Sequence, residues 1–321
     1  MRMQRRFAAV ATMVAVGVLA LSSCAAGGGT PGDEADDDYS IGVVVLDLQD
    51  PDIALMTDAM QGEADADGVT LVVADSKKDT STELNQIEDL ITRQVDAIIL
   101  QPLDGEASQT AAKRVTEAGI PLFILSTEFA EGADVDYVSY IGVDDTVAGE
   151  MQAEYLNELL PDGGPIVFAA GVYGASWTDR RKSGFDSKIN SNFTVVAEFQ
   201  AKGSRDDAKR NMEDTLQRFG KGEIIAVVAN NDEMALGAAS AIADAGRTDE
   251  FTAVVGVDGT APAVAAIEDG TMTATVRQES AEQGVKAVNV VSEYLGGKDV
   301  DDRYTLPFTL ITAANAADFS E

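Results

Sequence analysis

Short β-branched runs alternate with longer segments of helical period along most of this chain, and this order constrains the fold more than any other feature. The segment Thr82–Gln94, for example, repeats its apolar residues at the spacing of one helix face. Strands that alternate with helices predict right-handed βαβ units and doubly wound parallel sheets, an α/β fold. Because the strand runs are continuously apolar, we expect both faces of the sheets to be covered. The predicted strands are Ile41–Leu46, Thr70–Ala74, Ala97–Gln101, Leu122–Leu125, Ile166–Ala170, Thr194–Phe199, Ala226–Ala229, Ala253–Val257 and Ala274–Val276.

A weak internal repeat favours two similarly built lobes. Val72–Asp75 and Val195–Glu198 share a pattern before a helix, and Glu117–Gly119 and Asp244–Gly246 share one after a helix. Glycine commonly follows a helix end, so helix chemistry alone produces either match. The two matches nevertheless agree in offset to within the length of a loop. With 321 residues the chain is long enough for two compact domains.

The first 38 residues carry a targeting signal and a linker. A basic start is followed by the apolar run Phe7–Leu21, which is shorter than a membrane span and fits a secretory signal peptide over residues 1–23. The run ends in Leu21-Ser22-Ser23-Cys24, which resembles a bacterial lipobox and predicts lipidation of Cys24. The alternative is a chance cysteine after an ordinary cleavage site. Residues 24–38 are rich in glycine and acid, and we expect a flexible tether there. Export by the general or the twin-arginine route stays open.

Charge and composition exclude several classes of protein. The chain has 55 acidic residues against 23 Lys and Arg, a formal net charge of −32, which disfavours any surface that follows nucleic-acid phosphates. It has no His and a single Cys, which excludes Ser-His-Asp and Cys-His catalysis, His-ligated metal sites and an intrachain disulfide. An enzyme that uses carboxylates alone stays open.

Two segments place polar side chains after predicted strands. Asn231 and Asp232 lie between a buried strand and an Ala-rich helix, where Asp232 is suited to cap the helix. Asn231 carries an amide that both donates and accepts hydrogen bonds, as a hydroxyl-rich ligand requires. Val255–Thr260 repeats the arrangement at the next strand and leaves Asp258 at the same edge. Ligands of open α/β sheets bind at this edge.

These motifs resemble the sugar-binding group of the type I periplasmic binding proteins, which includes ribose-binding protein. The resemblance runs from about Tyr39 to Leu310. It is carried by N-N-D-E-M-A-L-G-A at 230–238, G-V-D-G-T at 256–260, A-T-V-R-Q ending at Gln278 and the less distinctive R-K-S-G-F at 181–185. It implies two α/β lobes, residues 39–143 plus 279–306 and residues 144–278 plus 307–321, joined by three hinge crossovers. It also implies that Arg181, Asn231, Asp258 and Gln278 contact the ligand.

Other family positions are altered here. The Asn, Pro and aromatic pair that the ribose-type proteins show after the first strand are replaced by Asp50-Pro51-Asp52-Ile53, and their later Asp-Arg pair by Ser126-Thr127 followed by Glu128. An aromatic expected near Gly203 is absent, so ribose itself is doubtful. The single tryptophan either stacks on a sugar or covers the core of the second lobe. The further candidate ligand-binding residues are therefore Asp50, Asp52, Thr127, Glu128 and Trp177.

The sequence thus predicts an extracytoplasmic lipoprotein, anchored to the membrane only by Cys24, that binds a monosaccharide or polyol and delivers it to an ABC permease with a cytoplasmic ATPase. We expect a monomer that is not an enzyme, with no cofactor, no metal and no nucleic-acid partner. One alternative keeps the binding but docks a receptor kinase or chemoreceptor, and another has a cationic or amino-bearing ligand. A sugar-responsive repressor would need a basic headpiece where this chain has a signal peptide. A secreted enzyme would use Asp50, Asp52, Glu128 and Asp258.

Overall fold

A computed structural model describes residues 39–130 and 132–320 of the chain. The predicted signal peptide, Cys24 and the tether lie outside the described residues. In the described part, no helix combines the length and the apolar character that crossing a membrane requires.

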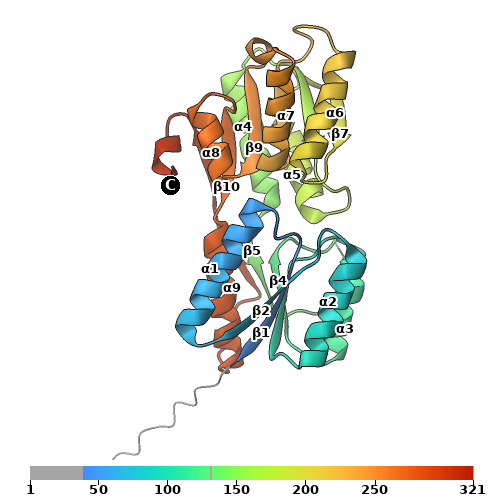
Figure 1. Ribbon diagram of the computed structural model, residues 1–321, viewed down its shortest axis with the longest axis vertical. Helices are drawn as coiled ribbons and strands as arrows, with labels where there is room; N and C mark the ends of the chain where they lie inside the picture. The colour runs from blue at the N-terminus through green and yellow to red at the C-terminus, as the bar shows by residue number, and fades with distance from the viewer. Residues whose placement is uncertain (1–38, 131, 321) are drawn as a thin grey trace, which may run out of the picture. The chain divides into compact units, whose positions relative to one another are not determined.

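The first lobe is built on a sheet in the order β11-β5-β4-β3-β1-β2, in which all strands are parallel. Helices α1 and α9 pack against each other on this lobe, and α2 packs with α3 (Figure 1). The elements of the first lobe are β1 (Ser40–Val45), α1 (Pro51–Asp67), β2 (Thr70–Asp75), α2 (Thr80–Arg93), β3 (Ala97–Leu100), α3 (Ser108–Glu117), β4 (Leu122–Ser126), β5 (Ser139–Gly142), α9 (Ser280–Leu295) and β11 (Arg303–Thr305).

The second lobe is built on a sheet in the order β12-β10-β9-β8-β6-β7, in which only β12 is antiparallel to its neighbour. Helix α4 packs with α5, and α6 packs with α7. The elements of the second lobe are α4 (Asp145–Leu159), β6 (Gly164–Ala170), α5 (Ser176–Lys188), β7 (Phe193–Gln200), α6 (Arg205–Arg218), β8 (Ala226–Ala229), α7 (Asp232–Asp244), η1 (Thr248–Glu250), β9 (Ala253–Asp258), α8 (Ala261–Glu268), β10 (Ala274–Gln278), β12 (Phe308–Thr312) and η2 (Ala316–Asp318).

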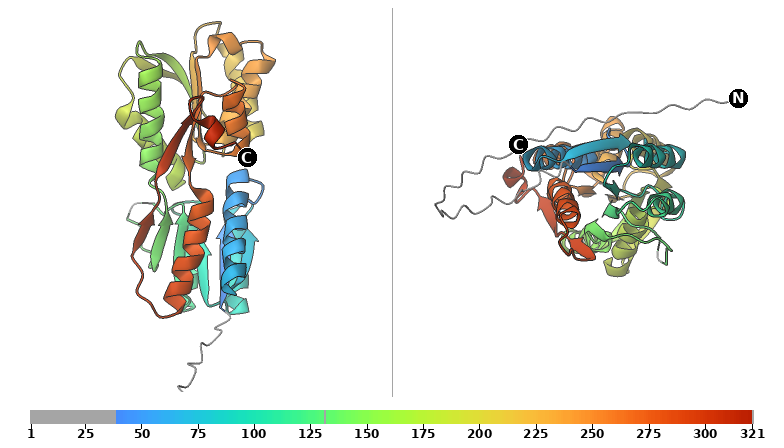
Figure 2. Two further views of the ribbon diagram at one scale, coloured as in Figure 1. Left: turned by 90° about the vertical axis from the view of Figure 1, so that its left-hand side faces the viewer. Right: turned by 90° about the horizontal axis from the view of Figure 1, so that it is seen from below.

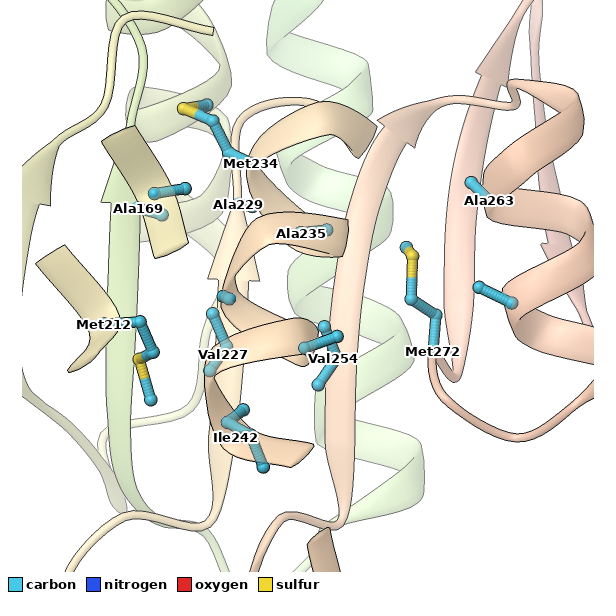
Figure 3. Close-up of a cluster of buried hydrophobic side chains, with 14 of the residues drawn as sticks. Ala169, Met212, Val227, Ala229, Met234, Ala235, Ile242, Val254, Ala263 and Met272 are labelled. Atoms are coloured by element: carbon cyan, nitrogen blue, oxygen red, sulfur yellow. The ribbon is translucent and has the colours of Figure 1, made fainter. Parts of the chain in front are cut away.

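Each sheet separates two apolar layers, because successive side chains of a strand point to opposite faces. In β1, Val43 belongs to the core under α1 and α9, whereas Val44 belongs to the core under α2 and α3. The second lobe repeats this arrangement, and one of its cores joins α6, α7 and α8 to the sheet (Figure 3). Burial of each Val or Ile side chain contributes about 1.5–3 kcal/mol, so these layers supply the main driving force for folding.

The predicted fold class is confirmed, and each of the nine predicted strands is present to within two residues. The expected burial on both faces is wrong for β2 and β7. These two strands lie at sheet edges and are mostly half-buried or exposed. Gly68 ends α1 in the left-handed conformation, with φ 72°. The acidic segment Glu63–Asp67, whose alternating acids resemble the start of a calcium-binding loop, is therefore the last part of a helix.

The chain passes between the two sheets three times. It crosses between β5 and α4, between β10 and α9, and between β11 and β12. Figure 2 shows the last of these crossings, where the C-terminal segment runs from the first lobe into the second. The crossings bring parts of the chain that are far apart in sequence to the junction of the two lobes.

Candidate functional site

A cavity that opens to solvent lies between the two lobes, and the space free of atoms in the cavity and its mouth together amounts to about 620 Å³. It receives the carboxyl ends of parallel strands and the first turns of helices from both lobes, which is where open α/β sheets bind ligands. Eight of the nine predicted ligand-binding residues line it, and Glu128 does not. The lining residues are Leu46, Asp50, Asp52, Ile53, Lys78, Gln101, Leu103, Ser126, Thr127, Asp145, Val172, Trp177, Arg181, Lys202, Gly203, Asn231, Asp258 and Gln278.

Arg181, on α5, is the buried cation of this cavity, and only 4% of it is exposed. Its Nε donates to Oδ1 of Asp145 at 2.7 Å, and its Nη1 donates to the carbonyl of Asn230 at 2.6 Å and lies 3.5 Å from Oδ1 of Asp258. Burial alone would lower the pKa of the guanidinium, but Asp145 and Asp258 outweigh it and raise that pKa. Nη2 donates no hydrogen bond to the described residues. The guanidinium therefore keeps a charged donor for a ligand.

Gln278, the last residue of β10, connects two carboxylates from different lobes. Its Nε2 donates to Oδ2 of Asp52 at 2.9 Å and to Oδ1 of Asp258 at 2.8 Å. Ser280 donates to the other oxygen of Asp52 at 2.5 Å. Among the described residues, neither the buried Oε1 of Gln278 nor Oδ2 of Asp258 accepts a hydrogen bond. Both oxygens are thus able to accept hydrogen bonds from the hydroxyl groups of a ligand.

Burial makes these carboxylates hard to ionise. It raises the pKa of Asp52 to about 7, and the nearby Asp50 adds to this effect, while the hydrogen bond from Ser280 and the charge of Arg181 oppose it. Burial, followed by the charge of Asp52, raises the pKa of Asp258 well above its ordinary value, although Arg181 lowers it. A ligand that donates hydrogen bonds to these oxygens would replace the water they lose on burial.

Asp258 is held in a backbone conformation that few residues other than glycine adopt, with φ 127°. Strain of this kind costs about 1–3 kcal/mol and persists where surrounding contacts enforce it. Asp232 supplies such contacts. It accepts from the amide of Thr260 at 2.9 Å and from the hydroxyl of Thr275 at 2.6 Å, and it is completely buried. The loop after β9 is therefore fixed to α7 and β10.

The helix cap that the sequence assigns to Asp232 belongs to Asn231, and the assignment to Asp232 is wrong. Oδ1 of Asn231 accepts from the amide of Met234 at 3.0 Å, and Asp232 is the first residue of α7. The cap uses only the oxygen of the amide. The nitrogen Nδ2 of Asn231 makes no hydrogen bond to the described residues. Asn231 therefore presents a donor to the cavity while it starts the helix.

The remaining predicted residues form the walls. Asp50 caps α1 by accepting from the amide of Asp52 at 3.0 Å, and Thr127 donates to the carbonyl of Pro102 at 2.7 Å. Trp177 packs against the core of the second lobe and also lines the cavity, with its ring 5.5 Å from the guanidinium carbon of Arg181. The first lobe contributes the apolar side chains of Leu46, Ile53 and Leu103 to the same cavity. The cavity thus combines polar groups with apolar faces, as sugar sites do.

Glu128 lies outside the cavity, contrary to its place among the predicted ligand contacts. Its carboxylate is bound by Arg303 of β11 and by Arg180 of α5, and it borders a separate hollow. Its amide donates to the hydroxyl of Ser176 at 2.7 Å. Because Arg180 and Ser176 belong to the second lobe, Glu128 links the lobes, and its two oxygens are already occupied by cations of the protein.

Comparison with known proteins identifies the family. Residues 41–299 match the family described as a periplasmic binding protein domain. The chain belongs to the periplasmic binding proteins. It is 33% identical to the ribose import binding protein of Bacillus subtilis over 86% of this chain and 88% of that protein. It is 30% identical to the xylitol-binding protein of Mycolicibacterium smegmatis over 96% of this chain and 86% of that one.

A solved structure agrees with this assignment. An ABC transporter solute binding protein from Bacillus halodurans with bound myo-inositol superposes with a TM-score of 0.82 at 33% identity, covering 88% of this chain and 97% of that one. The family resemblance drawn from the sequence motifs is therefore confirmed.

Sequence reasoning missed several groups that line the cavity of this binding protein. Asp145 begins α4 directly after the first crossover and pairs with Arg181. Lys78 and Lys202 lie in loops of opposite lobes, after β2 and β7. Both lysines lie in loops without apolar period. Their position after a strand end is the only sequence signal that places them near the cavity, and lysines at such positions are commonly exposed to solvent.

Proposed function

We propose that this binding protein captures an uncharged monosaccharide or polyol between its lobes and delivers it to an ABC permease. The observation that carries the proposal is a set of groups in one cavity that have no hydrogen-bond partner among the described residues, namely the donor Nη2 of Arg181 and the acceptors Oδ2 of Asp258 and Oε1 of Gln278. A sugar hydroxyl donates and accepts at once, so adjacent hydroxyls satisfy such a mixed set.

Closure of the lobes would follow from contacts made on both sides of the ligand. Asp52 belongs to the first lobe and Asp258 to the second, and a ligand that contacts both is bound more tightly when the lobes approach. We place the lobe boundaries at residues 143–144, 278–279 and 306–307, where few residues link the sheets. A micromolar ligand corresponds to about −8 kcal/mol, which several charge-assisted hydrogen bonds of about 1.5–3 kcal/mol each supply after ordering costs.

The proposal includes an anchor outside the cytoplasm. The lipobox-like segment ending in Cys24, the only cysteine of the chain, supports acylation there, and the acidic residues that follow it suit a solvated tether. Such an anchor keeps the binding protein close to its permease. Labelling with a radioactive or clickable fatty acid in a bacterial host tests it, and a Cys24→Ala variant that is labelled equally would contradict it.

Titration calorimetry on residues 39–321 against sugars, polyols, amino sugars, polyamines and sugar acids tests the ligand class. We expect saturable binding of at least one neutral sugar or polyol, with recovery of the ligand unchanged after prolonged incubation. A ligand at 100 times its dissociation constant should add about 2.7 kcal/mol to the free energy of unfolding. Binding of polyamines alone would favour the cationic ligand instead, and conversion of the sugar would favour the carboxylate enzyme.

A sensory output is the second candidate, because a closed form that docks a permease could equally dock a receptor. Uptake of the identified ligand by cells that lack this binding protein decides between the two outputs. Loss of uptake supports transport, and unchanged uptake with a lost transcriptional or chemotactic response supports sensing.

A further inference from the structure

Lys78 enters the cavity from the loop between β2 and α2, in the first lobe. Its ammonium lies 3.2 Å from Oδ2 of Asp47, and one third of its side chain, 33%, is exposed. The backbone of Lys78 and of Lys77 before it is left-handed, with φ 56° and 53°. The amide of Lys78 donates to the carbonyl of Leu46 at 2.9 Å. The loop is thus tied to the end of β1, and it holds a conformation unfavourable for lysine.

Gly203, in the second lobe, leaves the space that Lys78 faces. Its φ is 69°, and a Cβ at this position would lie 3.9 Å from Nζ of Lys78, 3.6 Å from Nδ2 of Asn231 and 3.9 Å from the ring of Trp177. An ammonium of one lobe and an amide of the other therefore border the same small space beside an aromatic edge. A larger residue at 203 would fill that space.

Nζ of Lys78 and Nδ2 of Asn231 each carry hydrogen atoms that no described residue accepts. The ammonium of Lys78 carries three, and Asp47 is its one ion-pair partner among the described residues. Nδ2 of Asn231 carries two and donates to none of the described residues, while the oxygen of the same amide is used by the helix cap. Two donors that face one space require an acceptor, which a ligand oxygen provides.

We infer that Lys78 is a ligand-binding and specificity-determining residue, which donates together with Asn231 to an oxygen of the ligand in the space over Gly203. The oxygen belongs to an uncharged hydroxyl or ether, because Asp47 already neutralises the ammonium. The binding protein therefore selects neutral polyhydroxylated ligands that place an oxygen beside Lys78. This inference rests on the proposed function of the cavity.

The neighbouring Lys77 provides a matched control. It has the same charge and nearly the same backbone conformation, but it does not line the cavity. Lys78→Met and Lys77→Met remove the same charge from the same loop. Comparison of the two variants isolates the contact of Lys78 from the effects of net charge and of loop geometry.

The experiment measures dissociation constants of xylitol, myo-inositol and D-ribose for wild type, Lys78→Met and Lys77→Met by titration calorimetry, with melting temperatures of the ligand-free variants. Sorbitol and its acid analogue D-gluconate are titrated against the wild type as well. For each compound that the wild type binds, we expect Lys78→Met to weaken binding about ten- to a hundredfold, and Lys77→Met to change it less than about twofold. The two ligand-free variants should melt within a few degrees of each other. Lys78→Arg, which retains a charged donor, should recover part of the affinity.

Three outcomes are distinguishable. Equal dissociation constants for Lys78→Met and Lys77→Met would overturn the inference and leave the proposed function intact. Binding of D-gluconate more tightly than of sorbitol by the wild type would overturn the preference for neutral ligands. No binding of any sugar or polyol by the wild type would contradict the proposed function, and this inference with it.

Discussion

Gln278 donates a hydrogen bond to Asp52 across the two lobes, with 2.9 Å between Nε2 and Oδ2. The same nitrogen also donates to Asp258, so one amide serves two carboxylates that burial makes reluctant to ionise. At high pH both carboxylates ionise, and two negative charges then lie near each other in a desolvated space, which destabilises the folded protein. The stability of the ligand-free protein should therefore depend on pH in a direction that Asp52 determines.

Asp52 should make the ligand-free protein less stable as the pH rises from about 4 to about 7. Its pKa is about 7 in the folded chain and near 3.8 in the unfolded chain, so the folded chain binds more protons in this window. The free energy of unfolding then decreases with increasing pH. We expect Asp52→Asn to lose less stability than the wild type between pH 5 and pH 8, measured by urea unfolding.

A control for this experiment is Asp67→Asn, which changes an exposed acid at the end of α1. It should keep the pH response of the wild type, since it leaves Asp52 in place together with the other buried acids of raised pKa, Asp50, Asp232 and Asp258. The same pH response in Asp52→Asn as in wild type would show that Asp52 is ionised alike in both states of folding.

Asp258→Asn should lower ligand affinity about ten- to a hundredfold while the fold is kept. Asparagine tolerates a positive φ better than most residues, but it replaces one acceptor by a donor where ligand hydroxyls need acceptors. Titration calorimetry with the tightest sugar or polyol measures the change. Asp249→Asn, at an exposed position of η1, removes the same charge and should bind as wild type. Unchanged affinity in Asp258→Asn would remove this residue from the site.

Arg181→Ala should destabilise the protein, and not only abolish binding. It leaves Asp145 and Asp258 buried without their cation, a change that costs about 3–5 kcal/mol for a buried pair. The loss should be smaller at pH 5 than at pH 8, because burial raises the pKa of both acids and protonation removes the unpaired charge. Urea unfolding at the two pH values measures both effects.

Arg210→Ala is the control for that variant, since Arg210 is exposed and pairs with Asp207 three residues earlier on α6. It should change the free energy of unfolding by less than about 1 kcal/mol at either pH. An Arg181→Ala protein as stable as Arg210→Ala at pH 8 would mean that Asp145 and Asp258 are already protonated there.

The strands were predictable because a buried strand needs an unbroken apolar run, and nine such runs are visible in the sequence. β5, β11 and β12 were not. Ser139–Gly142 and Arg303–Thr305 are very short, and Phe308–Thr312 joins its sheet antiparallel to β10, so the pairing of all three depends on neighbours far along the chain. The residues at strand ends were predictable because parallel strands bring their carboxyl ends to one edge. Lys78 was not, because its role depends on the absence of a side chain at Gly203 in the other lobe.

Glu128 shows the other limit of the sequence. Its position after the strand-end pair Ser126-Thr127 predicts a ligand contact, but two arginines bind its carboxylate instead. Arg303 also lies over the ring of Tyr140, at 4.2 Å, and the hydroxyl of Tyr140 donates to the carbonyl of Val143 at the first crossover. Glu128 thus joins α5 of the second lobe to the strands that precede two crossovers. No local pattern reveals partners 52 and 175 residues away.

Glu128→Gln should weaken ligand binding about two- to tenfold although Glu128 does not line the cavity. The ion pair with Arg180 exists only while the lobes are in contact, so its loss lowers the population of that form and with it the apparent affinity. Titration calorimetry gives the affinity, and small-angle scattering of the ligand-free protein should show a larger radius of gyration. Glu117→Gln, which breaks the pair with Arg114 inside the first lobe, should change neither quantity. Equal affinities in the two variants would mean that the contact between the lobes does not depend on Glu128.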